Sequence, residues 1–367
     1  MESIIRLRKS AVLFIFMATI GALIGCESKE DTIPVEENED TTLIQILDGW
    51  EISKSKLGFE RNPIPCDMYF INAKTGFFVG FWGEIYKTTD AGISWHKQNS
   101  GTTLRLYSVF FLDEHTGFVS GRAAGGCLDD DCDKGSLFLK TIDGGETWEK
   151  TFFKDYTDIR CLHFFDHLNG LAIIHTPLPS SEKCSVAKTS NGGISWTLIE
   201  LDLYPTYYNH FYCFDNIIYI SGANQAIFKS KDQGHTWETL LTPLPAWSFV
   251  RNMYFYNESI GYIDGMSDMY KTEDGGLNWE IVDFPFTSFG TFHFYNETEG
   301  FNIVDVSEYE EGDFPTYKGC IGYQTDDGGT TWKKSVLSNS YFRYLTFFVQ
   351  RDLGYGINLS EFFTIKR

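Results

Sequence analysis

The 367-residue chain carries 50 acidic and 30 basic residues, and this net charge of −20 disfavours binding to nucleic-acid phosphates. Aromatic residues make up 17% of the chain, and short runs of alternating hydrophobic residues are bounded by Gly, Asn and Asp. This composition is typical of an all-β protein, and the length allows either two average domains or one large repetitive domain.

Residues 1–25 have the composition of a lipoprotein signal peptide. Three basic residues within positions 6–9 precede an apolar run, residues 11–23, that is too short to span a bilayer. The sequence LIGC that ends at Cys26 resembles the bacterial lipobox, in which the cysteine is lipidated and becomes the new N-terminus. Cys26 is therefore the predicted lipidation site. The alternative is a plain secretory peptide with an incidental cysteine.

Residues 26–43 have no apolar pattern and a dense negative charge, which predicts a flexible acidic tether. Lys29, Glu30 and Asp31 resemble the surface-export signal of Bacteroidota lipoproteins, a Lys followed by acidic residues. The sequence thus predicts an outer-membrane lipoprotein at the cell surface, bound to the membrane through its lipid anchor only. Cleavage removes three basic residues and one acidic residue, so the mature net charge would be −22.

From residue 88 onward, one eight-residue pattern occurs six times. An aspartate in such a turn accepts hydrogen bonds from backbone N–H groups of the same turn, and glycine supplies positive φ. The successive tryptophans are 53, 48, 41, 42 and 53 residues apart, which is the length of a four-stranded propeller blade. The copies are TTDAGISW (88–95), TIDGGETW (141–148), TSNGGISW (189–196), SKDQGHTW (230–237), TEDGGLNW (272–279) and TDDGGTTW (325–332).

These turns resemble the Asp-box, or BNR repeat, of sialidases, sortilin-type receptors and the photosystem II stability and assembly factor family. The resemblance implies that each turn joins the third and fourth strands of a blade, on the face opposite the usual ligand site, and that its tryptophan packs between blades. A structural role is therefore predicted for all six boxes. Their key residues are Asp90, Trp95, Asp143, Trp148, Asn191, Trp196, Asp232, Trp237, Asp274, Trp279, Asp327 and Trp332.

Each box follows an aromatic strand, a turn, and a glycine that begins a second apolar strand, as in MYFINAKTGFFVG (68–80). After Trp332 the chain supplies only three strands of a seventh blade. Residues 48–54, DGWEISK, resemble the strand that follows each box, and their pairing with the C-terminal strands would close the ring without exposed edges. We therefore predict one seven-bladed β-propeller of four-stranded blades over residues 44–367. It is similar to the photosystem II assembly-factor propellers.

Arginines at the starts of the first strands of blades are the predicted binding residues. These starts lie beside the central channel on the face opposite the boxes, here called the top face, together with the longest loops. Guanidinium groups in an acidic protein favour a carboxylate, a phosphate or an acidic partner segment. The assembly-factor family carries a comparable arginine-rich patch. Separate arginines paired with local acids are the alternative. The candidates are Arg105, Arg160, Arg251 and Arg343.

A weak calcium candidate is the acidic run that contains Asp129, Asp131 and Asp133. The run lacks the glycine and the distal glutamate of an EF-hand loop, so a solvated loop tip is favoured. The cysteines are not spaced as in a thiolate zinc site. No metal and no other cofactor is therefore predicted.

Two disulfides are possible in an oxidising envelope compartment. Cys127 and Cys132 flank the acidic run, and Cys161 and Cys184 are both predicted near the top of the third blade. The sequence alone does not determine the connectivity of the cysteines.

The pattern favours a non-enzymatic protein with an assembly or scaffold role, which binds an envelope or surface protein through its top face. A glycan-binding surface protein is one alternative. A sialidase-like glycoside hydrolase is another, but sialidases have six blades, and neither their Arg-Ile-Pro signature nor a tyrosine nucleophile with its glutamate is identifiable. The sequence also has no serine nucleophile elbow and no phosphate loop, and no nucleic-acid partner is expected.

Overall fold

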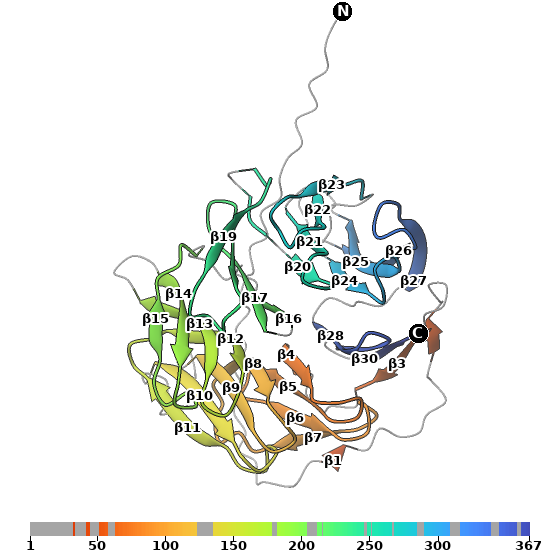
Figure 1. The fold of residues 1–367 in the computed structure, drawn as a ribbon. Coiled ribbons are helices and arrows are strands. Elements are labelled where there is room, and N and C mark those ends of the chain that lie inside the picture. Colours follow the sequence, from red (N-terminus) through yellow and green to blue (C-terminus); the bar gives the residue numbers. More distant parts are fainter. Residues whose placement is uncertain are drawn as a thin grey trace, which may run out of the picture. The chain divides into compact units, whose positions relative to one another are not determined.

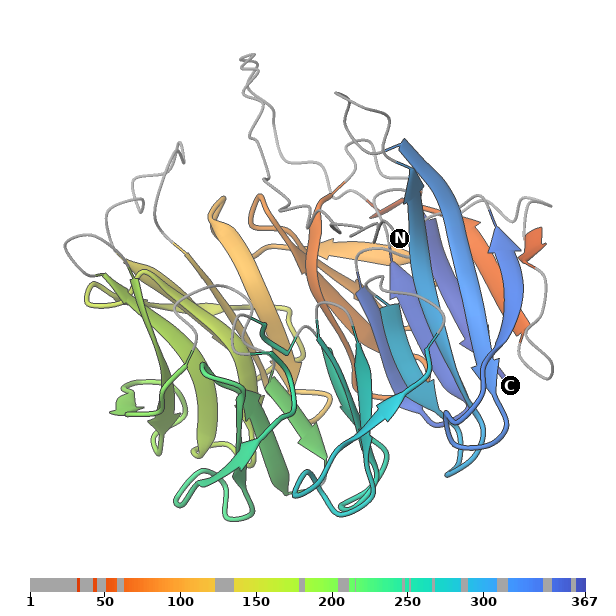
Figure 2. The ribbon, with the colours of Figure 1, turned by 90° about the horizontal axis from the view of Figure 1, so that it is seen from above.

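The computed structural model of the protein describes residues 32–33, 42–44, 51–57, 63–122, 135–177, 182–203, 211–214, 216–245, 248–250, 252–265, 268–284, 290–308, 316–338, 345–357 and 361–367. These residues form 30 strands and no helix, and none of them therefore provides a membrane-spanning helix. The strands make seven antiparallel sheets around a central axis (Figure 1) and run between the two faces of the ring (Figure 2). The prediction of an all-β, seven-bladed propeller is confirmed.

Each of the first six blades has four strands that follow one another from the channel outward. Blades one to three comprise β4 (Pro65–Phe70), β5 (Gly76–Gly80), β6 (Ile85–Thr88) and β7 (Trp95–Gln98); β8 (Arg105–Phe111), β9 (Gly117–Arg122), β10 (Ser136–Thr141) and β11 (Glu149–Phe153); and β12 (Asp158–Phe164), β13 (Gly170–Pro177), β14 (Glu182–Thr189) and β15 (Thr197–Ile199). Blades four to six comprise β16 (Phe211–Phe214), β17 (Ile217–Ser221), β18 (Ala226–Ser230) and β19 (Glu238–Leu241); β20 (Asn252–Phe255), β21 (Gly261–Asp264), β22 (Met269–Thr272) and β23 (Glu280–Val282); and β24 (Gly290–Phe294), β25 (Gly300–Glu308), β26 (Thr316–Thr325) and β27 (Lys333–Ser338).

The seventh blade joins the two ends of the chain. β28 (Leu345–Gln350), β29 (Leu353–Ile357) and β30 (Glu361–Lys366) are completed by the N-terminal strand β3 (Glu51–Lys56). β3 pairs with β30 over six residue pairs, from Glu51 opposite Lys366 to Lys56 opposite Glu361. The predicted closure of the ring by the N-terminal strand is confirmed.

Strand pairing starts earlier in the chain than the predicted domain boundary at residue 44. β1 (Thr32–Ile33) pairs with the outer strand of blade one, and β2 (Thr42–Ile44) pairs with β3. The flexible acidic tether over residues 26–43 stays a prediction, because most of these residues lie outside the described ranges. The pairing of β1 and β2 needs only backbone groups at an open sheet edge, which hydropathy patterns do not reveal.

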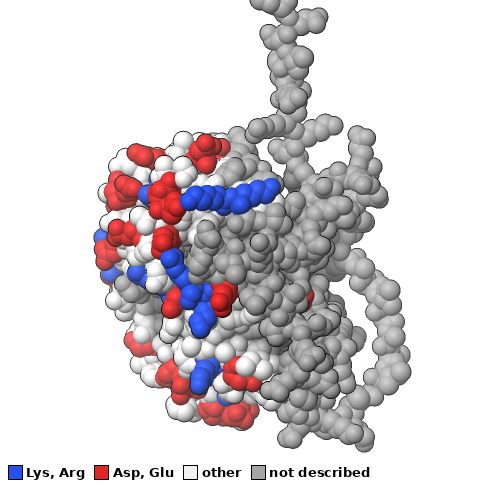
Figure 3. All heavy atoms as spheres, turned by 90° about the vertical axis from the view of Figure 1, so that its right-hand side faces the viewer, with Lys and Arg blue, Asp and Glu red and all other residues white. Residues whose placement is uncertain are grey.

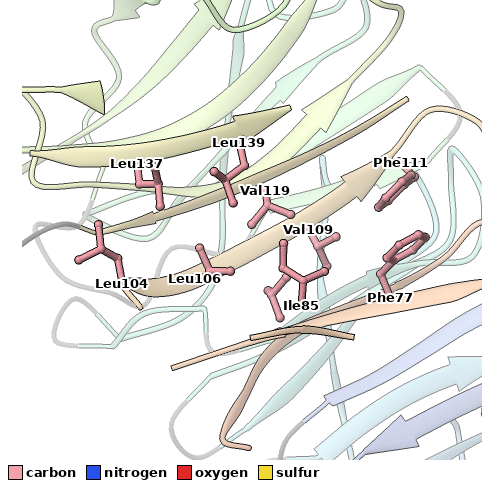
Figure 4. Packing of buried hydrophobic residues seen from close by; sticks show 10 residues of the cluster. Phe77, Ile85, Leu104, Leu106, Val109, Phe111, Val119, Leu137 and Leu139 are labelled. Carbon is pink, nitrogen blue, oxygen red and sulfur yellow. The ribbon is translucent and has the colours of Figure 1, made fainter. Parts of the chain in front are cut away.

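An aromatic layer connects adjacent blades. Phe77, at the start of β5, stacks on Phe111, at the end of β8, with ring centroids 3.9 Å apart (Figure 4). The layer recurs at four more interfaces, with centroid distances of 3.7 to 4.4 Å: Phe118–Phe164, Tyr219–Phe255, Tyr262–Phe294 and Tyr355–Phe70. These rings are buried, so they contribute both apolar burial and stacking to each interface.

A glycine makes room for each of these phenylalanines within its own blade. A Cβ atom on Gly117 would lie 2.4 Å from the ring of Phe111, closer than real Cβ contacts allow. Gly76, Gly170, Gly261, Gly300 and Gly354 stand in the same relation to the last phenylalanine of their inner strands. The glycine that begins the second strand in six of the seven blades is therefore required for space.

We expect Gly117→Ala to reduce the free energy of unfolding by about 2 kcal/mol, because the added methyl group overpacks a buried interface. Phe111→Leu should remove most of this cost, so the double variant would be more stable than the sum of the two single effects predicts. Urea unfolding of the four proteins measures the coupling. Strictly additive effects would contradict this account of the interface.

The six box turns share one hydrogen-bond pattern on the face opposite the top face, here called the box face. In the second blade, Thr141 Oγ1 donates to Asp143 Oδ1 over 2.7 Å and accepts the N–H of Gly145 over 2.9 Å. Asp143 also accepts bonds from the backbone N–H and the hydroxyl of Thr147. The side chains of Asp90, Asn191, Asp232, Asp274 and Asp327 accept the equivalent bond from the first Thr or Ser of their boxes.

The box tryptophans pack against the inner strand of the same blade. Trp148 meets the ring of Phe111 edge-on, at 6.1 Å and 86°, and also packs on the cluster that contains Phe77 of the preceding blade. Trp95, Trp196, Trp279 and Trp332 make the same edge contact with Phe70, Phe164, Phe255 and Phe294, and Trp237 packs beside Leu171. Five of the six boxes thus connect the box face to the aromatic layer, and the fourth packs on an aliphatic cluster instead.

Hydrogen bonds from the box turns lower the pKa of the box aspartates. Those from Thr147 and Thr141 lower the pKa of Asp143 to about 2, and those from Asn278 and Thr272 do the same for Asp274. Because these folded-state pKa values lie below the ordinary value, the carboxylates stabilise the fold above about pH 4, and this contribution is lost as the pH falls toward 2.

The double variant Asp143→Asn/Asp274→Asn should therefore lose less stability between pH 4 and pH 2 than the wild type does. The reciprocal variant, Asn191→Asp, adds a titrating group to the third box and should lose more. Urea unfolding at several acidic pH values compares the three slopes. Identical slopes would rule out this role of the box carboxylates.

Candidate functional site

The inner strands of the first three blades are irregular near the top face. Their pairing with the second strand shifts register at Pro65/Asp67 in β4, at Leu106/Ser108 in β8 and at Arg160/His163 in β12. Cys161, within the third irregularity, has a φ of 53°, in the left-handed region. Bulges of this kind re-aim side chains, and here they occur where the strands line the upper channel.

Polar groups connect these three strands across the blades. Asp67 Oδ2 accepts the Ser108 hydroxyl over 3.1 Å and the Val109 N–H over 2.9 Å. Ser108 Oγ in turn accepts the N–H of Leu162 from the third blade over 3.1 Å. One carboxylate and one hydroxyl therefore hold three inner strands in a fixed relation below the top face.

Burial raises the pKa of Asp67 to about 6, although its three hydrogen bonds act in the opposite direction. The folded protein then holds this proton at pH values where the unfolded chain has released it. The corresponding stabilisation is complete below about pH 4 and is lost as the pH rises through 6.

A second polar cluster surrounds Asp158, the first residue of β12, which is fully buried. Arg160 Nη2 donates to Asp158 Oδ2 over 3.3 Å, and Arg122 Nη1, from the top end of β9, lies 3.7 Å from the same oxygen. His175 Nε2 lies 3.9 Å from Asp158 Oδ1. Burial disfavours the charge on Arg160, but Asp158 outweighs this effect and raises its pKa.

Arg105 has a different environment, at the first position of β8. Its guanidinium carbon lies 3.7 Å from the ring centroid of Phe81 and 5.9 Å from that of Tyr107. Its Nη1 is 3.5 Å from the Tyr107 hydroxyl. Within the described ranges, no carboxylate lies at ion-pair distance from Arg105. This half-buried cation is therefore held by aromatic rings rather than by an acid.

The structure brings two of the four predicted arginines together. Tyr107 lies between them, because the guanidinium of Arg160 stacks 3.9 Å from its ring and that of Arg105 approaches the same ring. The other candidates, Arg251 and Arg343, lie outside the described residues, so a ring of four remains a prediction. Cys26, Asp129, Asp131 and Asp133, and the cysteine pair Cys127 and Cys132, also lie outside them.

Two polar neighbours of this cluster, Arg122 and Asp158, were not among the predicted residues, whereas Trp82 is one of the exposed aromatic residues that the sequence suggests for sugar stacking. Arg122 lies directly opposite Arg105 in the β8–β9 pairing, and Asp158 lies two residues before Arg160 on the same side of its strand. Trp82, in the top-face turn after Phe81, is 49% exposed. Side chains two residues apart on a strand share one face, so the sequence of β12 already places Asp158 beside Arg160. Arg122, in contrast, can be identified only once the register between β8 and β9 is known.

A disulfide between Cys161 and Cys184 is not formed, and the proposal from sequence is wrong. Neither cysteine is in a disulfide, and they lie on β12 and β14, which flank β13 in the sheet. Neighbouring strands are about 4.8 Å apart, so strands on either side of a third are separated by about 10 Å, beyond the Cα separation of a disulfide. Cys184 instead lies 3.7 Å from His175 Nε2.

The described residues contain no group of three or more His, Cys, Asp or Glu side chains placed to hold a metal ion. Among the side chains coloured by charge in Figure 3, acidic and basic groups are interspersed, and no broad basic area appears. The view in Figure 3 shows one side of the molecule only. At the top of blades one to three, the described residues place the guanidinium groups of Arg105 and Arg160 on either side of Tyr107.

The protein is a seven-bladed propeller with a polar, arginine-containing cluster on its top face. Solved structures of YCF48, a photosystem II assembly factor, have the same architecture. A YCF48 bound to a D1 peptide aligns with a TM-score of 0.64 and 18% identity, over 88% of this chain and 99% of that one. YCF48 from Cyanidioschyzon merolae gives 0.60 and 14% identity, over 85% and 98%.

A GH74 xyloglucanase from Xanthomonas campestris is also similar, with a TM-score of 0.52 and 11% identity over 77% of this chain, which spans 46% of that enzyme. At these identities the likenesses concern the fold alone. The predicted resemblance to photosystem II assembly-factor propellers is confirmed at that level. The sequence matches no protein-family model and no curated protein.

The raised pKa of Asp67 predicts how the stability of the protein depends on pH. Wild-type stability should decline between pH 4.5 and 7 relative to Asp67→Asn, by about 2 kcal/mol, because the amide does not titrate and its oxygen can still accept from Ser108 and Val109. Unfolding in urea across this pH range measures the difference. A constant gap between the two proteins would contradict the assignment.

Proposed function

We propose that this protein is a non-enzymatic, lipid-anchored envelope protein that binds a protein partner through its top face, in an assembly or scaffold role. The main observation behind this proposal is the environment of Arg105. Its guanidinium is positioned by Phe81 and Tyr107 but has no carboxylate partner in the described structure. A cation already ordered by its surroundings loses little conformational freedom when it binds an acidic group. The partner would therefore present a carboxylate at this site.

The similarity to YCF48 supports a protein partner. In that protein a propeller of the same architecture is bound to a D1 peptide. The aligned region covers 99% of the YCF48 chain, so the similarity extends over that whole propeller. The partner of the present protein would be an envelope or surface protein, because the N-terminal sequence predicts export.

The proposed membrane attachment is supported by the sequence of residues 1–31. A basic start, an apolar run and LIGC precede Cys26, and Lys29-Glu30-Asp31 follows it closely. Lipidation at Cys26 would place the propeller at the outer membrane, and the acidic residues after the lysine favour the cell surface. No other membrane contact is proposed.

Two alternatives have specific support. Trp82 follows Phe81, on whose ring Arg105 stacks, and it is exposed. An exposed indole on the top face would suit a glycan. The similarity to GH74 proteins supports a glycoside hydrolase as the second alternative. This chain, however, spans less than half of either GH74 protein. Sialidase-like activity rests only on the resemblance of the boxes.

The test is capture of envelope proteins by the tagged mature chain, with Arg105→Glu and the matched control Lys231→Glu. Lys231 is exposed in the fourth box, on the opposite face, so the two variants change charge equally. We expect Arg105→Glu to weaken binding of the captured protein at least tenfold, since it places an anion against the partner's carboxylate, while Lys231→Glu binds normally. Purified partner and titration calorimetry give the ratio.

Equal partner binding by Arg105→Glu and Lys231→Glu would show that Arg105 does not contribute to the binding site. Retention of glycans by the wild type, with loss in Trp82→Ala, would favour the glycan alternative. Release of reducing sugar from xyloglucan or sialosides by the purified protein would overturn the non-enzymatic assignment.

A further inference from the structure

A thiol and an imidazole meet between the inner strands of blades three and four. Cys213 Sγ, in β16, lies 3.3 Å from His163 Nε2, in β12, and the two strands belong to neighbouring blades (Figure 1). We infer that this pair binds one soft monovalent metal ion, Cu⁺ or its analogue Ag⁺. The inference goes beyond the proposed function, because it depends neither on the arginine cluster and its partner nor on the lipid anchor.

The two donor atoms suit such an ion. Thiolate sulfur is a soft ligand that favours Cu⁺ over hard cations, and imidazole nitrogen also binds copper well. Cys213 is not in a disulfide, so its sulfur can coordinate a metal. Burial lowers the pKa of His163 to about 4. The ring is therefore neutral near pH 7, and this is the form of histidine that coordinates metals.

The charge balance favours a monovalent ion. A Cys213 thiolate, a neutral His163 and Cu⁺ together carry no net charge, whereas a divalent ion would leave one positive charge at the site. Three aromatic rings surround the imidazole, with centroid distances of 4.9, 5.0 and 6.0 Å to Phe110, Phe165 and Phe211. An uncompensated charge is costly in such apolar surroundings.

The number of donors also favours Cu⁺ or Ag⁺. In the part of the chain that the structure describes, no group of three His, Cys, Asp or Glu side chains is placed around a metal. Structural zinc takes four ligands and calcium takes six or more, so neither matches this pair. Cu⁺ and Ag⁺ form stable complexes with two ligands.

The spacing of the pair needs only a small adjustment. Metal–sulfur and metal–nitrogen bonds of about 2.3 and 2.0 Å add up to about 4.3 Å when the three atoms are in line. The Cys213 sulfur and the His163 nitrogen would therefore move apart by about 1 Å as the ion enters. The S–H bond breaks, an S–Cu bond forms, and one proton passes to solvent. Both side chains are only half-buried, so an ion can reach them.

A second cysteine–histidine pair differs in access. Cys184 Sγ lies 3.7 Å from His175 Nε2, which is also 3.9 Å from Asp158 Oδ1. All three side chains are buried, and the carboxylate is already bound by Arg160. An ion would have to enter a closed polar cluster there. Cys184 is therefore a control with the same two donor types.

Titration of the full-length protein with Cu⁺, without oxygen and in competition with bathocuproine disulfonate, tests the site. We expect one tight equivalent in the wild type, with the release of one proton. Cys213→Ser should weaken this binding about a hundredfold and His163→Phe about tenfold, because each removes one ligand. Cys66→Ser and Cys184→Ser should leave it unchanged. Cysteines elsewhere in the chain are common to all five proteins, so the differences between them report this pair.

Silver gives a second readout that needs no change in the cysteines. In protein with ¹⁵N-labelled histidine, one equivalent of Ag⁺ should shift the ring signals of His163, which are assigned by their absence in His163→Phe. Unshifted signals would overturn the site. Equal Cu⁺ affinity in the wild type and Cys213→Ser, or an equal loss in Cys66→Ser, would also overturn it. Urea unfolding shows that each variant is folded before titration.

Discussion

The stacking of one phenylalanine between two blades is the interaction on which the rest of the propeller depends. Phe111 lies over Gly117 of its own blade, faces Phe77 of the preceding blade and meets the edge of its own box tryptophan. A side chain on the glycine would displace the ring, and a smaller residue at 111 would leave a cavity between sheets. The repeat of this arrangement explains why aromatic residues, glycines and box turns recur together.

Because the aromatic layer and the box turns hold the blades together, the residue types at the upper ends of the inner strands can differ from blade to blade. The box face repeats nearly the same hydrogen bonds six times, whereas the top of blades one to three carries a different polar residue on each strand. Asp67, Ser108 and the Leu162 N–H bridge these strands below the arginines, so the polar cluster is supported by groups that are themselves held in place. Binding function can therefore change without loss of the repeat.

The fold was predictable from the sequence because each blade repeats the same local chemistry. Turn residues, the glycine and the aromatic spacing all act within one blade, and the unfinished seventh blade indicated the closing strand. The site was less predictable, since Arg122 and Asp158 meet across two blades and depend on register. One signal was present and missed: a lysine precedes five of the six boxes, and Lys87 and Lys229 donate to Gly144 O and Gly275 O of the next blade.

Arg105 and Arg160 have similar positions in the repeat but different surroundings. Arg160 has a buried carboxylate beside it, so its removal would leave Asp158 with one fewer cation, and much of the effect would be structural. Arg105 is oriented by Phe81 and Tyr107, and among the described residues no carboxylate lies at ion-pair distance from it. Both arginines lie at the start of an inner strand. The same position in the repeat therefore gives the two guanidinium groups different electrostatic surroundings.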